Sequence, residues 1–399
     1  MSKTLRFSIF LMILILSACE VADGSQSPVL TATMAPTETP SPSETRSVTN
    51  PTPSLTPTFT QTSILPTSTL RVLAGDQMGP GVNPLTGLPV DETDNLDRRP
   101  VMVKISNWPR SGRPHAGLTS ADVVFEYFIG FQMNRFLAVY YGENAEEIGP
   151  VRSGRLVDAQ LVNFFGGILG YGDADPLVDD VIIGALGNRA FGFLDTPCPA
   201  MCGEATHDAT GVFANSAELT AYAEEQGVDP VVPNLGGMYF SEEPPPGEED
   251  GKLLHVEYAD FSVMEWRYDP SVEQYRLWME AEAGDSLELA PMTDRNNEDP
   301  VVFDNIIVMY AEYIEYEPSL HDIVLRDAVG YQPALLFRSG EVTYGSWRTP
   351  DPYQLIRFET PDGNPLPLKP GKTWIVIVGK RSYTTQPVGG EWEIYFDLP

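Results

Sequence analysis

The sequence contains few of the residues that most often build catalytic and metal sites. Its 399 residues include three cysteines and four histidines, and the histidines are widely separated: His115, His207, His255 and His321. No HExxH, Gly-x-Ser-x-Gly or Walker A motif occurs, and no paired Cys/His nucleophile motif is present. We therefore expect no metal and no cofactor. The sequence leaves catalysis open but favours a binding protein over an enzyme.

Basic residues are also scarce. The 25 Lys and Arg face 56 Asp and Glu, which gives a formal net charge of -31. Nucleic-acid binding depends on Lys and Arg that neutralise phosphates, so nucleic acid is excluded as a partner. The same charge opposes general adhesion to anionic lipid or to polyanionic wall polymer.

The sequence lacks a hydrophobic segment of membrane-spanning length. Its longest mainly apolar stretch, residues 7–16 with Ser8 within it, follows Lys3 and Arg6 and makes only about 15 Å of helix, against the ~30 Å of a hydrocarbon core. This layout is typical of a secretory signal. Residues 16–19, Leu-Ser-Ala-Cys, resemble the lipobox of bacterial lipoproteins. We expect residues 1–18 to be removed and Cys19 to carry the acyl chains, palmitate among them, that hold the protein on the extracytoplasmic face of a membrane. An ordinary signal peptide with a chance cysteine is the alternative.

A stretch rich in Ser, Thr and Pro follows the predicted anchor. Between Thr31 and Leu70, 26 of 40 positions are one of these three residues, and no periodic apolar pattern is present. Such a segment buries too little apolar surface to offset the entropy of ordering it. We therefore predict that residues 19–82 form the lipidated cysteine and a disordered stalk.

The remaining residues predict an α+β protein with two domains. A mixed α/β domain at 83–235 has strands near 101–106, 122–128, 136–141 and 166–171, and helices at 155–165, 176–186 and 216–225. An acidic, Pro-rich linker occupies 236–251. Short runs rich in Val, Ile, Tyr, Phe and Trp then predict a mainly antiparallel β domain at 252–399.

The two cysteines outside the lipobox, Cys198 and Cys202, stand in Cys-Pro-Ala-Met-Cys. Outside the cytoplasm an even pair of this kind indicates a disulfide. A zinc site with His207 is the alternative, although no fourth ligand is evident. A redox-active pair is disfavoured because thioredoxin-type motifs have two residues between the cysteines.

Arginines suggest a binding site in the first domain. Nine Lys and Arg lie between Arg98 and Arg189, and none lies from residue 190 to 251. Arg152 and Arg155 directly precede a predicted helix, where guanidinium groups and free backbone N–H groups favour an anion. We predict an anion or ligand site that also uses Arg135 and Lys104. In the alternative, these basic residues pair with the carboxylates Asp122, Glu126 and Asp173 and only stabilise the sheet edge.

Several motifs resemble the YerB-like lipoproteins, the family of domain of unknown function 3048. The motifs are Asn83-Pro84-Leu85-Thr86-Gly87, Arg113-Pro114-His115-Ala116-Gly117, Ser120-Ala121-Asp122-Val123-Val124-Phe125-Glu126, Gly149-Pro150-Val151-Arg152-Ser153-Gly154-Arg155 and Leu368-Lys369-Pro370-Gly371-Lys372-Thr373-Trp374. The resemblance implies a two-domain extracytoplasmic lipoprotein and supplies no reaction. The chain departs from the family pattern at the cysteine loop and at residues 206–208, which weakens any role for His207.

Three functions follow as hypotheses. The first is an envelope protein that binds a partner protein or a wall-derived ligand through a groove of the first domain. The second is a phosphoryl-transfer or hydrolytic enzyme acting on lipid-linked wall polymer through Arg152 and Arg155, by loose analogy with LytR-type wall ligases. The third is a carbohydrate-binding module that presents tryptophans of the C-terminal part: Trp266, Trp278, Trp347, Trp374 and Trp392.

Overall fold

The computed structural model describes residues 71–204, 210–247, 249–280, 287–326, 328 and 330–398. The predicted signal peptide, Cys19 and most of the predicted stalk lie outside the described residues, and so does His207. The described residues belong to one compact unit.

The fold is rich in sheet and poor in helix. Its α-helices are α1 (Leu156–Phe165), α2 (Pro176–Leu186) and α3 (Ser216–Glu225). Local signals set their ends: the Asp175 side chain accepts a hydrogen bond from the backbone N–H of Leu177 at the start of α2, with Pro176 in the first turn. Gly166 ends α1 in the left-handed conformation, with φ of +57°.

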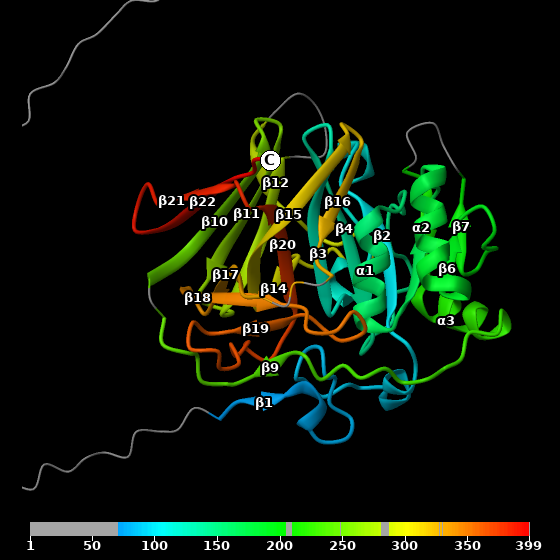
Figure 1. The fold of residues 1–399 in the computed structure, drawn as a ribbon, viewed down its shortest axis with the longest axis horizontal. Coiled ribbons are helices and arrows are strands. Elements are labelled where there is room, and N and C mark those ends of the chain that lie inside the picture. Colours follow the sequence, from blue (N-terminus) through cyan, green and yellow to red (C-terminus); the bar gives the residue numbers. More distant parts are fainter. Residues whose placement is uncertain are drawn as a thin grey trace, which may run out of the picture. The chain divides into compact units, whose positions relative to one another are not determined.

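A long mixed sheet runs through the molecule (Figure 1). In spatial order its strands are β6 (Ala190–Gly192), β5 (Ile168–Tyr171), β2 (Val101–Ser106), β4 (Met133–Tyr140), β3 (Val123–Gly130), β20 (Thr373–Gly379), β15 (Asn305–Glu317), β17 (Gln332–Arg338), β18 (Glu341–Arg348) and β19 (Arg357–Glu359). Neighbours β6, β5 and β2 are parallel, and so are β3, β20 and β15. Strand β16 (Leu320–Val324) pairs with the far half of β15.

Strand β20 joins the two parts of the chain that the sequence analysis treats as separate domains. It lies between β3 of the first part and β15 of the second, and it pairs in parallel with both. Every residue of β3 and of β20 is buried. A parallel strand buried on both faces reads as a continuous apolar run and needs a neighbour on each side. The two parts therefore share one sheet, and the second part is not wholly antiparallel.

A second sheet covers one face of the first. Its strands are β21 (Tyr383–Thr385), β22 (Gly390–Tyr395), β10 (Glu249–Ala259), β11 (Ser262–Asp269) and β12 (Gln274–Glu280), with β13 (Leu289–Pro291) and β14 (Val302–Phe303) paired to β12. Aromatic rings fill the space between the two sheets: Trp374 of β20 lies 4.9 Å from Trp266 of β11 and 5.3 Å from Phe303, measured between ring centroids. Four of the five tryptophans considered for sugar binding, Trp266, Trp347, Trp374 and Trp392, are buried.

Two segments predicted to be unstructured belong to the folded body. Residues 73–77, assigned to the stalk, form β1 (Leu73–Ala74) and a short 3-10 turn, and β1 pairs with β9 (Tyr239–Phe240) of the assigned linker. Arg338 donates hydrogen bonds from its guanidinium to the backbone carbonyls of Ser241 and Glu242. Backbone pairing and this buried arginine fix segments whose composition alone indicates no structure.

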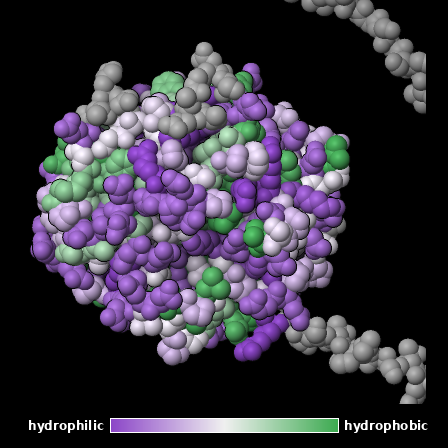
Figure 2. Space-filling view, turned by 180° about the vertical axis from the view of Figure 1, so that it is seen from behind, coloured by the Kyte–Doolittle hydropathy of each residue, from purple (hydrophilic) through white to green (hydrophobic). Residues whose placement is uncertain are grey.

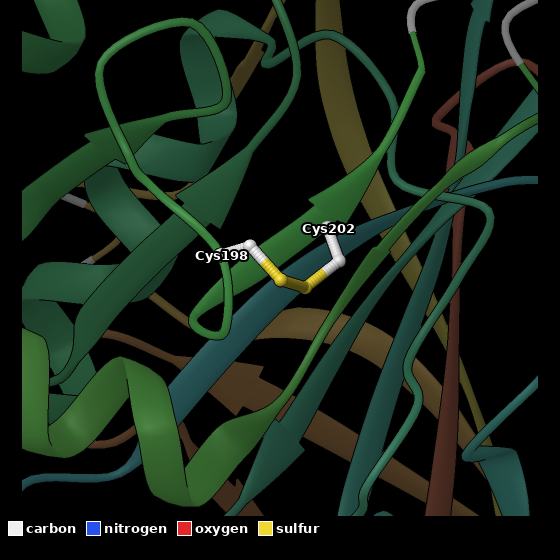
Figure 3. Close-up of a disulfide and its surroundings, with 2 residues drawn as sticks. All are labelled: Cys198 and Cys202. Atoms are coloured by element: carbon white, nitrogen blue, oxygen red, sulfur yellow. A yellow bond between two sulfur atoms is a disulfide. The ribbon is translucent and has the colours of Figure 1, made fainter.

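Cys198 and Cys202 are joined by a disulfide (Figure 3). Cys202 lies on β7 (Met201–Gly203), which pairs with β8 (Val212–Ala214), and Cys198 lies in the loop before it. With the two sulfurs bonded to each other, neither offers a thiolate to a metal.

The three α-helices gather at one end of the molecule, beside β2 and β6 (Figure 1). Within the described residues, no helix has the length and apolar character needed to cross a bilayer. On the face seen in Figure 2 most residues are hydrophilic, with apolar residues in small groups between them.

Candidate functional site

The four predicted basic residues lie together on the face of the central sheet that α1 covers. Residues directly opposite each other on antiparallel strands point to the same face, and β4 pairs Leu137 with Lys104 and Arg135 with Tyr127. The side chains of Lys104, Tyr127 and Arg135 therefore point toward α1. The segment 152–155, which leads into α1, brings Arg152 and Arg155 to the same place.

Lys104 lies at the bottom of this group. Its ammonium lies 3.3 Å from Oδ1 of Asp158, and both side chains are fully buried. Lys104 also donates a hydrogen bond to the Tyr127 hydroxyl, and Nζ lies 3.9 Å from the centroid of the Tyr127 ring. The Tyr127 hydroxyl donates to the same carboxylate oxygen of Asp158. Strands β2 and β3 and helix α1 thus meet around one buried carboxylate.

Asp158 also fixes the start of α1. Its other oxygen, Oδ2, accepts a hydrogen bond of 2.7 Å from the backbone N–H of Arg155, the residue that precedes the helix. A carboxylate at the third helical position that reaches back in this way is one half of a capping box. The Lys104 ion pair and the entry of the chain into α1 therefore depend on the same side chain.

Arg135, Arg152 and Arg155, here called the arginine cluster, surround this pair and are partly exposed. Arg135 Nη1 donates to the carbonyl of Ser153 at 2.8 Å, and Arg155 Nη1 donates to the carbonyl of Gly154 at 3.0 Å. Arg152 Nε lies 3.4 Å from the Ser106 hydroxyl. Among the described residues, no carboxylate lies within 4.0 Å of a nitrogen of Arg135 or Arg155. Arg155 Nε is buried and finds no hydrogen-bond partner there.

Burial and mutual repulsion disfavour the charges of these cations. Burial lowers the pKa of Lys104 to about 7, with Asp158 opposing that change and Arg135 and Arg155 adding to it. The pKa of Arg135 falls well below its usual value because of burial and the nearby charges of Arg155 and Arg152. Burial beside Asp158 raises the pKa of the Tyr127 hydroxyl well above its usual value, so Tyr127 stays neutral.

The three predicted acidic members of the site lie elsewhere. Asp122, at the start of β3, accepts hydrogen bonds from the Asn83 side chain at 2.8 Å and from the backbone N–H groups of Tyr141 and Gly142. It lines a cavity of about 410 Å³ that also includes Lys372. The alternative in which Asp122 would pair with an arginine of the cluster is therefore wrong. Its carboxylate instead links the Asn83 side chain to the backbone of Tyr141 and Gly142.

Glu126 and Asp173 are also separate from the arginine cluster. Glu126 points to the opposite face of the sheet, where its carboxylate accepts hydrogen bonds from Trp374 Nε1 at 2.7 Å and Asn134 Nδ2 at 2.8 Å. Asp173 is exposed and lines a cavity of about 370 Å³ with Asp179 and Asp195. Glu126 and Tyr127 are consecutive residues of β3, and consecutive strand residues face opposite sides of a sheet. Glu126 therefore points away from the arginine cluster.

Sequence reasoning missed two members of the site, Tyr127 and Asp158. A signal existed for Asp158, which precedes Leu161, Val162 and Phe165 by three, four and seven residues and so lies on the buried face of α1. A charged residue in an apolar stripe implies a buried partner. No comparable signal marked Tyr127, because its position beside Lys104 depends on which strands pair. No group of three or more His, Cys, Asp or Glu within the described ranges is placed to hold a metal ion.

Comparisons with known proteins agree on one family. Residues 85–228 match the model described as "Protein of unknown function (DUF3048) N-terminal domain", and residues 254–375 match its C-terminal domain. The chain is 30% identical over 312 residues to "Putative lipoprotein YerB" of Bacillus subtilis (strain 168), covering 74% of this chain and 85% of that protein. The crystal structure of the YerB protein from Bacillus subtilis superposes with a TM-score of 0.60 at 27% identity, over 74% of this chain and 96% of that chain.

Proposed function

Because this chain belongs to the DUF3048 family of YerB-like proteins, we propose that it is a lipid-anchored envelope protein whose folded part binds an anionic ligand. The anchor is the lipobox cysteine, Cys19, exposed after removal of residues 1–18. The ligand site is the arginine cluster above Lys104. The protein acts outside the cytoplasm, as a receptor or carrier for an envelope partner or wall-derived ligand.

One observation carries the anion site: positive charge exceeds negative charge around Asp158. Among the described residues, three guanidinium groups and one lysine lie near the carboxylate of Asp158, and Asp175 is a second acidic group close enough to act on the charge of Arg155. The same protein has a formal charge of -31, so carboxylates are abundant elsewhere. Guanidinium groups that are half-buried beside each other repel and lose hydration, and an oxyanion relieves both costs.

The position of the arginine cluster in the fold also favours an anion. The arginine cluster lies at the start of α1, where the helix dipole favours negative charge. It also lies at the carboxyl ends of the parallel strands β2 and β5, the edge at which open sheets most often bind ligands. Backbone bonds fix this edge: Arg152 N donates to the carbonyl of Lys104, and Gly172 N donates to the carbonyl of Arg152.

The charge of the whole protein narrows the ligand class. A long polyanion bound at the arginine cluster would be repelled by the acidic residues of the rest of the protein. A single terminal oxyanion, such as one phosphate or sulfate group, would contact the arginine cluster alone. We therefore propose an oxyanion-bearing ligand that presents one charged group at a time.

Titration of sulfate into the full-length chain in detergent, followed by calorimetry, tests this proposal. We expect saturable binding that weakens as ionic strength rises. The Arg152→Gln/Arg155→Gln variant should bind at least about tenfold more weakly, because each lost charge-assisted hydrogen bond contributes roughly 1.5–3 kcal/mol.

The matched control removes two arginines from the other sheet. Arg267 of β11 and Arg276 of β12 have partly exposed side chains that pair with Glu265 and Asp269. The Arg267→Gln/Arg276→Gln variant loses the same charge and should keep the sulfate affinity of the original chain. Equal sulfate affinity in the two double variants would overturn the proposed site.

A further inference from the structure

The environment of Lys104 differs from that of an ordinary structural ion pair. Its ammonium is fully buried, and within the part of the chain that the structure describes the one carboxylate within 4.0 Å of it is that of Asp158. That carboxylate also receives hydrogen bonds from the Tyr127 hydroxyl and the Arg155 backbone N–H. The carboxylate that pairs with Lys104 is therefore shared with two other donors.

We infer that the arginine cluster binds its anion together with a proton, which Lys104 accepts on Nζ from the solvent. This inference rests on the proposed anion site. The amine needs a second negative charge close by to hold its proton in a fully buried position, and an oxyanion among the three guanidinium groups supplies that charge. Anion and proton then stabilise each other, so each raises the affinity for the other.

The titration of Lys104 agrees with this geometry. Burial lowers its pKa to about 7, and the positive charges of Arg135 and Arg155 lower it further while Asp158 raises it. Near neutral pH the empty site therefore holds Lys104 partly unprotonated. A bound anion offsets the two arginine charges, so the pKa of Lys104 rises and a proton is taken up.

The other groups that face Lys104 do not account for such a proton. Tyr127 of β3 remains neutral because its pKa lies well above 10. Arg135 of β4 and the arginines of segment 152–155 keep their charge, since guanidinium groups do not lose a proton in proteins. Asp158 of α1 is the remaining titratable neighbour. Its carboxylate is held by the donors described above.

Calorimetry of sulfate binding at pH 6 and at pH 8.5 measures the proton directly. Sulfate does not titrate in this range, so it adds no proton of its own. At each pH the full-length chain is titrated in two amine buffers that differ in ionisation enthalpy, which converts proton uptake into heat. We expect uptake near zero at pH 6 and approaching one proton at pH 8.5, with sulfate affinity falling by up to about tenfold per pH unit above pH 7.

The variants Lys104→Arg and Lys104→Met separate this inference from the proposed anion site. Lys104→Arg keeps a permanent charge and Lys104→Met removes it, so both should bind sulfate without proton uptake and with an affinity that does not change with pH. Sulfate binding with no uptake in the original chain at pH 8.5 would overturn the proton linkage alone. No sulfate binding at either pH would overturn the anion site itself. Uptake that persists in both variants would assign the proton to another group.

Discussion

At the scale of single residues, Glu126 and Lys104 lie on opposite faces of the central sheet, and each is an ionisable side chain in apolar surroundings. Each is fully buried. Lys104 meets a carboxylate, whereas Glu126 accepts hydrogen bonds from the neutral side chains of Trp374 and Asn134. Burial without a cation raises the pKa of Glu126 to about 7. The sheet therefore has a carboxyl group that ionises at neutral pH.

Glu126 makes the free energy of unfolding depend on pH. Its pKa is about 7 in the folded chain and about 4.3 in an unfolded chain. Between these values the folded state keeps a proton that the unfolded state releases. The stability that this group contributes is full below about pH 4.3 and is lost as pH rises through 7, by up to about 1.4 kcal/mol per pH unit. The Glu126→Gln variant should lack this loss, and urea unfolding at pH 5 and pH 7.5 measures it.

A control for this prediction lies on the surface. Glu391 of β22 is exposed, and the Glu391→Gln variant should follow the pH trend of the original chain. If the stability difference between the original chain and Glu126→Gln is the same at pH 5 and pH 7.5, the buried carboxyl is not the source of the trend.

The sequence predicted the residues of the site unequally, for physical reasons. Arg152 and Arg155 are separated by two residues just before a helix, so their proximity follows from the local sequence. Arg135 and Lys104 join them through strand pairing. Asp122 and Glu126 were considered as ion-pair partners of these basic residues, but strand alternation and a loop contact place their carboxylates elsewhere. Residues that are close in the sequence can be assigned to one site only where their side chains point to the same face of the sheet.

At the scale of elements, the pairing of β20 with β3 decides how the chain folds. Five residue pairs join these strands, and Trp374 of β20 contacts Phe136 of β4 and Trp266 of β11. The first part of the chain therefore has an uncovered strand edge and an incomplete core when the second part is absent.

A fragment of residues 71–235 should not fold by itself. Without β20, the fully buried strand β3 loses its neighbour and the aromatic layer above it. We expect the fragment to lack a cooperative thermal transition, and co-expression with residues 236–399, which include β9 and all of β10, should restore one. Circular dichroism against the full-length chain measures this. Cooperative unfolding of the isolated fragment would mean that the first part is an independent domain.

The helices and most strands could be predicted because their signals are local. The Asp175-Pro176 start of α2 and the apolar run of β20 need only neighbouring residues. The sheet order could not be predicted, because the pairing of β20 with β3 joins segments about 250 residues apart. The order at β1 and β9 was missed for the same reason, since β1 pairs with β9 and β9 also pairs with Leu368, all far apart along the chain.

At the scale of the whole molecule, this acidic protein depends on its predicted anchor to stay at a membrane. The proposed lipid on Cys19 keeps the protein at a membrane surface whose anionic lipids would repel its net charge of -31. One acyl chain gives only reversible membrane binding, whereas two or more hold a protein stably.

The Cys19→Ala variant tests the anchor. We expect it to lose metabolic palmitate label and to move from the detergent phase to the aqueous phase in phase partitioning. A Cys198→Ala/Cys202→Ala variant should keep both the label and the partitioning, because its lipobox is intact. Unchanged labelling of the Cys19→Ala chain would contradict lipidation at this position.

The most direct test of the account is the position of a bound oxyanion in a crystal. Selenate has the shape and charge of sulfate, and its selenium gives an anomalous signal. In crystals of the protein grown with selenate, we predict an anomalous peak within hydrogen-bond distance of the Arg152 and Arg155 guanidinium groups. The account is contradicted if the site is ordered without a peak and the two arginines are engaged by carboxylates of the same chain.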